Sequence, residues 1–241
     1  EITLEGGDVM MISKNQVLIG VSERTTIGAA VELMQILFEK KIVEKVTIIQ
    51  IPKKRDFMHI DTVFTQVKKN IWVLLGTFKA NNKLQTKYDL STCIKEKEDE
   101  QTNIWQYHIN QYKPIYFDSI EALLIDISTK DFNCTEPVKI IYSGNDEFPY
   151  SLREQWTDSC NLLALKEGVV IGYDRNDKTI EAFKNAQFNI IKVQDLLQNL
   201  EDKTMDFETM KDTFILIPSA ELSRARGGFH CMSLPLLRDE Y

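Results

Sequence analysis

The chain has 241 residues, of which 43% are hydrophobic and 27% are charged. This composition suits a chain that buries a sizeable core, and it excludes the disordered, collagen-like and disulfide-rich classes. Lysine and arginine number 29 against 36 acidic residues, which gives a formal net charge of -7. We therefore expect no nucleic-acid partner, and the acidic balance favours a small cationic substrate.

The cysteines and histidines do not form a recognisable metal-binding pattern. The four cysteines, Cys93, Cys134, Cys160 and Cys231, include no CxxC pair, and the chain has only three histidines. We expect reduced cysteines, no bound metal and a cytoplasmic location. The chain has no charged-then-apolar leader and no apolar run of about eighteen residues, so we also expect no membrane partner.

Three segments share one pattern, in which an apolar strand, a polar turn and a second apolar strand ending in glycine follow one another. The second strands are residues 17–20, 73–76 and 169–172, and the turns before them are residues 13–16, 68–70 and 166–168. Lysine, asparagine and glycine in these turns suit a hairpin reversal. The pattern predicts an internal repeat of β-hairpins.

A helix-like segment and then a further strand follow each hairpin. The expected helices are residues 26–41, 119–128 and 178–186, and the expected strands are residues 46–51, 138–142 and 188–193, with a final strand at 213–218. The repeating unit is therefore hairpin, helix and strand. Such ββαβ modules bury their apolar faces by packing together, and an arrangement around one axis would bring their loops to a common site.

The middle copy is interrupted by residues 79–113, a polar and charge-rich stretch. We interpret this insertion as a solvated excursion with its own hairpin near Trp105 to Tyr112, rather than as a separate domain. We therefore expect one α/β domain over residues 1–241. Because the first residue is glutamate, we expect the chain to begin inside a longer protein, and the polar tail after Cys231 indicates a natural end.

Cys231 is the first candidate for chemistry. It follows Gly227 and Gly228, which permit close backbone approaches, and its basic neighbours Arg224, Arg226 and His230 favour a thiolate. The alternative for Cys231 is a small buried hydrophobe, the common fate of a free cysteine.

His59 and Asp61 form the second candidate group. Two residues apart, they would share one face of a strand. A histidine can give a proton to a leaving amine and later take one from water, and a carboxylate can pair with a planar guanidinium. The alternative is a structural histidine whose hydrogen bonds are satisfied in the core.

Four further residues are candidates near these groups. Glu5, in a Glu-Gly-Gly-Asp turn, could orient His59, although a turn-forming motif alone would also explain it; Asp8 is assigned to local turn hydrogen bonding. Arg24 and Arg226 could clamp a substrate carboxylate, while the alternative for Arg24 is an exposed, solvated side chain at a helix start.

On these residues the chain resembles the arginine deiminases of the guanidine-modifying pentein superfamily. The similar stretches are Glu5 to Thr25, Met58 to Val67, Arg153 to Trp156 with Asn161, Gly168 to Asn176, and Arg226 to Arg238. The resemblance implies a pentein-type α/β-propeller of pseudosymmetric ββαβ modules, here incomplete at the N-terminus. It also implies hydrolysis of L-arginine to L-citrulline and ammonia without metal or organic cofactor. Cys231 would be the nucleophile and His59 the general acid and base.

The resemblance assigns the remaining roles as well. Asp61 falls on the guanidinium-binding carboxylate, Glu5 on the glutamate beside the histidine, and Arg24 and Arg226 on arginines that hold the substrate's α-carboxylate. A second guanidinium-binding aspartate of the family lies upstream of the position of Glu5, and no residue here takes that role. Unless a missing N-terminal segment or another copy in a homo-oligomer completes the site, we expect weak or no turnover.

Two other functions stay open. Phe229-His230 stands where arginine deiminases commonly have proline and arginine, whereas a His-Cys pair is familiar in agmatine deiminases and glycine amidinotransferases. An amidinotransferase would replace water with an amine acceptor. A catalytically impaired arginine-binding fragment or guanidino-ligand sensor is the third possibility.

Overall fold

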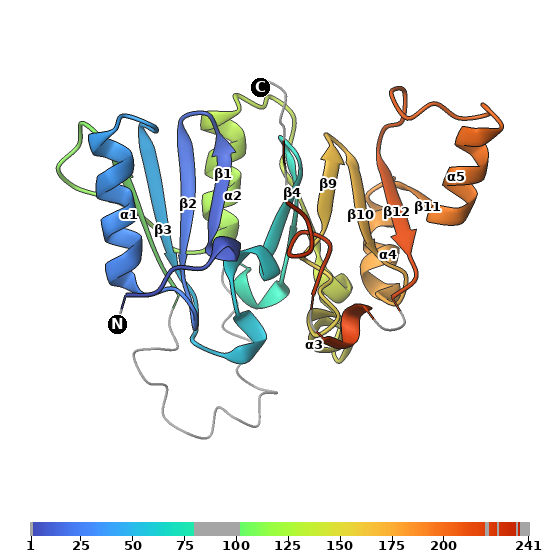
Figure 1. The fold of residues 1–241 in the computed structure, drawn as a ribbon, viewed down its shortest axis with the longest axis horizontal. Coiled ribbons are helices and arrows are strands. Elements are labelled where there is room, and N and C mark those ends of the chain that lie inside the picture. The colour runs from blue at the N-terminus through green and yellow to red at the C-terminus, as the bar shows by residue number, and fades with distance from the viewer. Residues whose placement is uncertain (1, 80–101, 220–221, 226, 235, 237–241) are drawn as a thin grey trace. The chain divides into compact units, whose positions relative to one another are not determined.

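The computed structural model describes residues 2–79, 102–219, 222–225, 227–234 and 236 (Figure 1). The strands are β1 Val9–Ser13, β2 Gln16–Val21, β3 Lys45–Gln50, β4 Phe64–Lys68, β5 Ile71–Leu74, β6 Asn103–His108, β7 Ile115–Phe117, β8 Lys139–Tyr142, β9 Leu163–Lys166, β10 Val169–Tyr173, β11 Asn189–Lys192 and β12 Thr213–Ile217. The α-helices are α1 Ile27–Glu39, α2 Ile120–Asp126, α3 Tyr150–Gln155, α4 Asp177–Asn185 and α5 Val193–Glu201.

The chain divides into two compact units, and each is a mixed α/β structure. The first contains Glu1–Val63, Thr77–Leu123 and Pro235–Tyr241, and the second contains Phe64–Gly76 and Leu124–Leu234. The division falls within α2, so each unit is built from segments that are distant in the sequence.

The first unit is organised by a five-stranded sheet with the order β1-β2-β3-β6-β7. β2 runs parallel to β3, and the other neighbouring pairs are antiparallel. Helix α1 begins after Thr26, whose hydroxyl accepts a hydrogen bond from the Ala29 N–H at 3.3 Å and so caps the helix. The helix is the crossover that returns the chain from β2 to the parallel strand β3.

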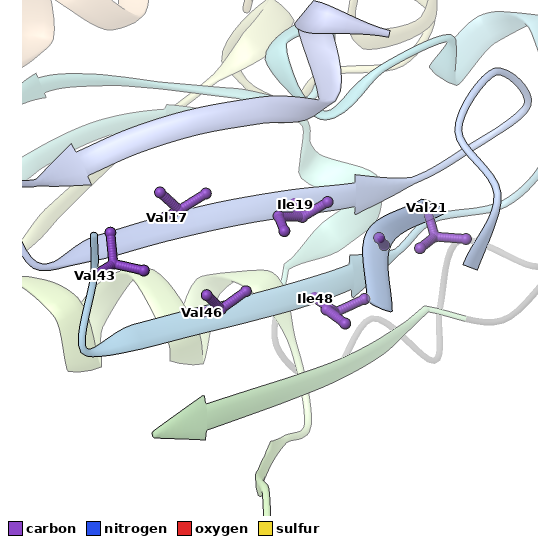
Figure 2. Packing of buried hydrophobic residues seen from close by; sticks show 7 residues of the cluster. Val17, Ile19, Val21, Val43, Val46 and Ile48 are labelled. Atoms are coloured by element: carbon purple, nitrogen blue, oxygen red, sulfur yellow. The ribbon is translucent and has the colours of Figure 1, made fainter. Parts of the chain in front are cut away.

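One face of this sheet carries an aliphatic core (Figure 2). Val17, Ile19 and Val21 lie on β2 at alternate positions, so they project to the same side, where they join Val46 and Ile48 of β3. Residues of α1 and of β6 pack against this cluster. The residues of β2 are buried on both faces, which explains why this strand reads as a continuous apolar run.

The second unit contains two sheets, with the orders β4-β5-β8 and β11-β12-β10-β9. In the first, Trp72 is fully buried and its indole N–H donates to the Ser128 hydroxyl at 2.8 Å. In the second, Leu196 of α5 packs on the face that carries Ile215. The ring centroid of Phe183 in α4 lies 4.4 Å from that of Phe214. Phe214 is next to Ile215 on β12, so its side chain is on the opposite face of that strand.

The three predicted hairpins are present, and they share one irregularity. β1 pairs with β2, β4 with β5 and β9 with β10, each antiparallel. In every hairpin the register leaves one residue of the first strand without an opposite partner, next to the turn: Ile12, Val67 and Leu165. A register shift at the same place in three hairpins agrees with the predicted repeat.

The structure adds one detail to the predicted organisation and corrects another. In the third copy, β12 rather than β11 lies beside β10, and β11 pairs with the far side of β12. In the insertion, residues 80–101 lie outside the described residues. β6 and β7 form a hairpin near the predicted place, but β7 begins at Ile115, beyond the predicted end at Tyr112. β6 also pairs with β3 along its whole length, so this end of the insertion belongs to the sheet and is not a solvated excursion.

Candidate active site

His59 and Glu5 form a close pair in the first unit. The Nε2 atom of His59 lies 2.6 Å from the Oε2 atom of Glu5, and the two side chains are 15% and 45% exposed. An imidazole protonated at Nε2 therefore donates to this carboxylate, which fixes the ring's orientation. The sequence-based prediction that Glu5 orients His59 agrees with this geometry, although 54 positions separate them.

Asp61 lies on the other side of the same imidazole. Its Oδ1 atom is 3.8 Å from His59 Nδ1, and its side chain is 2% exposed. His59 is extended and Asp61 belongs to the 3-10 turn Ile60–Thr62, so the pair is brought together by a turn rather than by one strand face. Gly7 leaves room for the ring, since a Cβ atom there would lie 2.6 Å from Nδ1.

Arg24 lies near the same cluster. Its guanidinium is 3.8 Å from Glu5 and 4.0 Å from Glu23, and its side chain is 46% exposed. Ion pairs this long and this exposed contribute little to stability, so they can be exchanged for a substrate carboxylate at small cost. The solvated alternative for Arg24 is compatible with the same exposure.

Asp8 has a larger role than the local turn hydrogen bonding predicted for it. It is fully buried; its Oδ2 accepts from the Ser22 hydroxyl at 2.7 Å and its Oδ1 from the Ile60 N–H at 3.0 Å. The Ser22 oxygen in turn accepts from the Arg24 N–H at 3.0 Å. One buried carboxylate thus joins the loop of Arg24 to the loop of His59.

The environment of Asp8 has opposing effects on its ionisation. Burial raises the pKa of its carboxyl, while hydrogen bonds from Ser22, Thr25 and Ile60 and the charge of His59 lower it, and the net direction is upward. Desolvation therefore outweighs the hydrogen bonds. Sequence reasoning missed this residue because a Gly-Gly-Asp turn and a buried link between loops look alike in sequence.

Cys231 lies in the second unit and is exposed, which rules out the alternative of a buried hydrophobe. Its N–H donates to the Oδ1 atom of Asn161 at 3.0 Å. The close approach predicted for the paired glycines is present at Gly228, where a Cβ atom would lie 2.3 Å from the same oxygen. Arg226 lies outside the described residues.

Two of the other cysteines, Cys160 and Cys134, have surroundings that differ from those of Cys231. Cys160 is fully buried, and burial raises the pKa of its thiol far above the ordinary value. Cys134 is half-buried, and desolvation is again the main cause that raises its pKa. Both environments disfavour the thiolate that a nucleophile requires. Cys93 lies outside the described residues.

Two searches of the described residues gave no site or span of another kind. Within these residues, no group of three or more histidine, cysteine, aspartate or glutamate side chains is arranged to hold a metal ion. Over the same part of the chain, no helix combines the length and apolar character needed to cross a membrane.

The chain thus combines three β-hairpins with a Glu-His-Asp cluster in one unit and an exposed cysteine after paired glycines in the other. The family model described as "Arginine deiminase" matches residues 1–238. The chain belongs to the arginine deiminase family.

Curated relatives agree with this membership. The chain is 32% identical over 241 residues to an arginine deiminase of Borreliella afzelii and 34% identical over 241 residues to one of Borrelia recurrentis. Each alignment covers 100% of this chain and 48% of the relative. The chain therefore spans about half the length of the curated relatives that it matches.

A solved structure supports the fold. The amidinotransferase SxtG of the saxitoxin biosynthetic pathway, from Microseira wollei, matches with a TM-score of 0.52 and 15% sequence identity. The match covers 100% of this chain and 49% of that chain. The predicted mixed α/β class is confirmed.

Proposed function

We propose that this chain carries the catalytic cysteine, histidine and carboxylates of an arginine deiminase, which hydrolyses L-arginine to L-citrulline and ammonia. The observation that carries the proposal is the Glu5-His59-Asp61 cluster, with 2.6 Å between glutamate and imidazole, in a chain that matches the family over residues 1–238. In this proposal the modules form part of an α/β-propeller, as the family resemblance implies.

The reaction begins with the thiolate of Cys231. Its sulfur attacks the planar guanidinium carbon and forms a C–S bond, which gives a tetrahedral adduct. His59 protonates the departing nitrogen, and the C–N bond breaks. Ammonia is released, and a thiouronium remains covalently bound to Cys231. The exposed position of Cys231 supports this role because a substrate can reach the sulfur.

The second half of the reaction uses the same histidine in the opposite sense. His59 takes a proton from water, the hydroxide attacks the thiouronium carbon, and the C–S bond breaks to release citrulline and the thiolate. Glu5 keeps the imidazole in one orientation through both steps, since its carboxylate contacts Nε2. The sum of the two halves is arginine plus water giving citrulline plus ammonia.

Asp61 and the arginines hold the substrate in this proposal. Asp61 is a nearly buried carboxylate beside His59, so it can pair with the guanidinium next to the proton donor. Arg24 and Arg226 bind the α-carboxylate at the other end of the substrate. These steps require no metal or organic cofactor.

The substitution Cys231→Ala tests the proposal. We expect it to abolish citrulline release while calorimetry still detects arginine binding, because the carboxylates and arginines remain. Cys134→Ala is the matched control, since it removes a half-buried cysteine of the same unit and leaves the site intact. Normal turnover in Cys231→Ala would falsify the proposal.

The same assay separates the other functions. Because a His-Cys pair is familiar in glycine amidinotransferases, the residues Phe229-His230 before Cys231 make an amine acceptor a candidate. Glycine is therefore added to the assay, and transfer of the amidino group to glycine is measured together with citrulline release. Transfer in place of hydrolysis would identify an amidinotransferase. Arginine binding without either product would identify a guanidino-ligand sensor or a fragment that needs another chain.

A further inference from the structure

Asn161 contacts the Cys231 loop at several points. Its Oδ1 atom accepts the Cys231 N–H at 3.0 Å, and its main-chain oxygen accepts the His230 N–H at 3.5 Å. Gly228 packs on the same side chain, where a Cβ atom would lie 2.3 Å from Oδ1 and 2.4 Å from the Asn161 Cβ. The side chain and the main chain of Asn161 thus both contact the loop of residues 228–231.

Asn161 is itself fixed. It is 1% exposed, and its N–H donates to the Asp158 carbonyl at 3.0 Å just before β9 begins. A buried amide oxygen that loses its partner is costly, so the bond to Cys231 resists opening. A second anchor lies on β10, where the Tyr173 hydroxyl donates to the Gly227 carbonyl at 2.6 Å and the Tyr173 ring lies 4.6 Å from that of Phe229.

These contacts matter because Cys231 lies in a turn and not in a helix or strand. An exposed loop thiol samples many positions unless its backbone is restrained. Attack requires the sulfur within about 3–3.5 Å of the carbon, and a misplacement of about 1 Å can cost about a hundredfold in rate. The restraint must act on the backbone, because the sulfur must stay accessible to the substrate.

We propose that Asn161 is a positioning residue that holds the Cys231 backbone so that the sulfur faces the substrate. This inference rests on the proposed function, which gives the Cys231 sulfur its role as nucleophile. The role of Asn161 itself is inferred from its contacts with the Cys231 loop. Asn161 does not touch the substrate; it acts through the Cys231 amide.

The main test compares Asn161→Ala with Asn176→Ala in the full chain. Asn176 is a matched control, because it is also 1% exposed in the same unit and its side-chain amide donates to the Thr157 carbonyl at 3.1 Å. In Asn161→Ala we expect the Cys231 amide to exchange hydrogen about tenfold faster. We expect kcat for arginine to fall about ten- to a hundredfold with KM nearly unchanged. Asn176→Ala should change neither quantity.

A conservative variant separates positioning from mere support of the fold. Asn161→Asp keeps an oxygen that accepts the Cys231 N–H, so the slow exchange of that amide should be retained. Its negative charge near the sulfur disfavours the thiolate, so alkylation of Cys231 by iodoacetamide should move to higher pH. If Asn161→Ala does not fold, Gly228→Ala disturbs the same contact from the other side and is expected to give the same loss of amide protection.

The outcomes are distinct for the two proposals. Equal exchange of the Cys231 amide in the unaltered chain and in Asn161→Ala would overturn the positioning role, as would an equal fall of kcat in Asn176→Ala. Absence of citrulline release from the unaltered chain, even after addition of the polypeptide that corresponds to the unmatched part of the relatives, would count against the proposed function alone. Amide exchange and alkylation need no turnover, so they decide the role of Asn161 in either case.

Discussion

Asp8 accepts hydrogen bonds from Ser22 and Ile60, and through them it fixes the loops that carry Arg24 and His59. Ser22 already accepts from the Arg24 N–H, so its own proton must point to Asp8. A carboxylate can accept from both loops, whereas an amide offers one oxygen and one donor. The geometry therefore calls for an aspartate at this position even though its ionised form is disfavoured by burial.

The raised pKa of Asp8 gives a pH-dependent stability. Because the pKa of this carboxyl lies above its usual value of 3.8, the folded chain holds the proton more tightly than the unfolded chain does. Its contribution to the free energy of unfolding therefore falls as pH rises from 3.8 through the raised value, and stays low above it.

The substitution Asp8→Asn isolates this effect. We compare the free energy of unfolding of the unaltered chain with that of Asp8→Asn. The first value minus the second should be largest at acid pH and should decline as pH rises from 3.8 through the raised pKa of Asp8. Urea denaturation at a series of pH values measures the difference. Asp118→Asn, at an exposed position of the same unit, should change stability by less than about 0.5 kcal/mol. A difference that grows as pH rises would contradict the assignment.

Reactive residues were easier to predict from the sequence than the residues that hold them. The candidates Glu5 and Cys231 lie near paired glycines and His59 lies two positions before Asp61, which made them recognisable in the sequence, and the structure places Glu5 and His59 together. Asp8 and Asn161 act through hydrogen bonds to backbone groups that are distant in the sequence. Neither spacing nor composition reveals such contacts, because they depend on how strands and loops pack.

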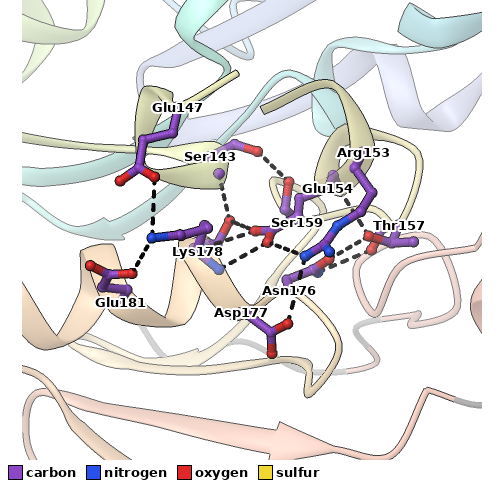
Figure 3. Close-up of polar contacts among 12 residues, drawn as sticks. Ser143, Glu147, Arg153, Glu154, Thr157, Ser159, Asn176, Asp177, Lys178 and Glu181 are labelled. Carbon is purple, nitrogen blue, oxygen red and sulfur yellow. Dashed lines mark hydrogen bonds and ion pairs between the residues drawn. The ribbon is translucent and has the colours of Figure 1, made fainter. Parts of the chain in front are cut away.

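At the scale of elements, Glu154 fixes the start of α4 in the second unit (Figure 3). It is fully buried, and its carboxylate accepts the Lys178 N–H at 2.9 Å and the Thr179 N–H at 2.8 Å. The Thr179 hydroxyl and Arg153 donate to it as well, at 2.7 Å and 3.0 Å. This carboxylate from α3 thus satisfies two of the N–H groups in the first turn of α4 and complements the helix dipole.

The substitution Glu154→Gln should destabilise the second unit. A glutamine would direct its NH₂ group at one of the donors that the carboxylate now satisfies, leaving a buried donor unpaired. We expect a loss of about 2–3 kcal/mol in the free energy of unfolding, measured by urea denaturation. Glu181→Gln on the same helix is the control, since its pair with Lys178 is exposed and should be worth less than about 1 kcal/mol. Equal losses in both variants would contradict the capping role.

The sequence predicted which elements form better than it predicted how strands pair. Local patterns identified all three hairpins and their turns, because turn residues and apolar runs are short-range signals. The position of β12 between β10 and β11, and the pairing of β6 with β3, depend on contacts between distant segments. β11 and β12 are both short strands that follow β10 in the chain, and local patterns do not show which of them pairs with β10.

At the scale of the whole molecule, the chain matches only 48% of the length of its curated relatives. Asp61 is the single residue of this chain assigned to the guanidinium. A guanidinium presents five donors, and burying it against one carboxylate leaves its charge poorly compensated. A second carboxylate from outside this chain would therefore be needed for full activity, supplied either by another segment or by a second copy.

We predict that another segment supplies it. Adding the polypeptide that corresponds to the unmatched part of the relatives should raise citrulline release at least about a hundredfold, because an uncompensated buried charge costs several kcal/mol. The Cys231→Ala chain with the same polypeptide should stay inactive, which excludes activity of the addition itself. If a second copy completes the site instead, activity per chain will rise with chain concentration and follow the mass measured by light scattering. Full activity that depends on neither addition nor concentration would contradict the prediction, because the chain itself would then compensate the charge of the guanidinium.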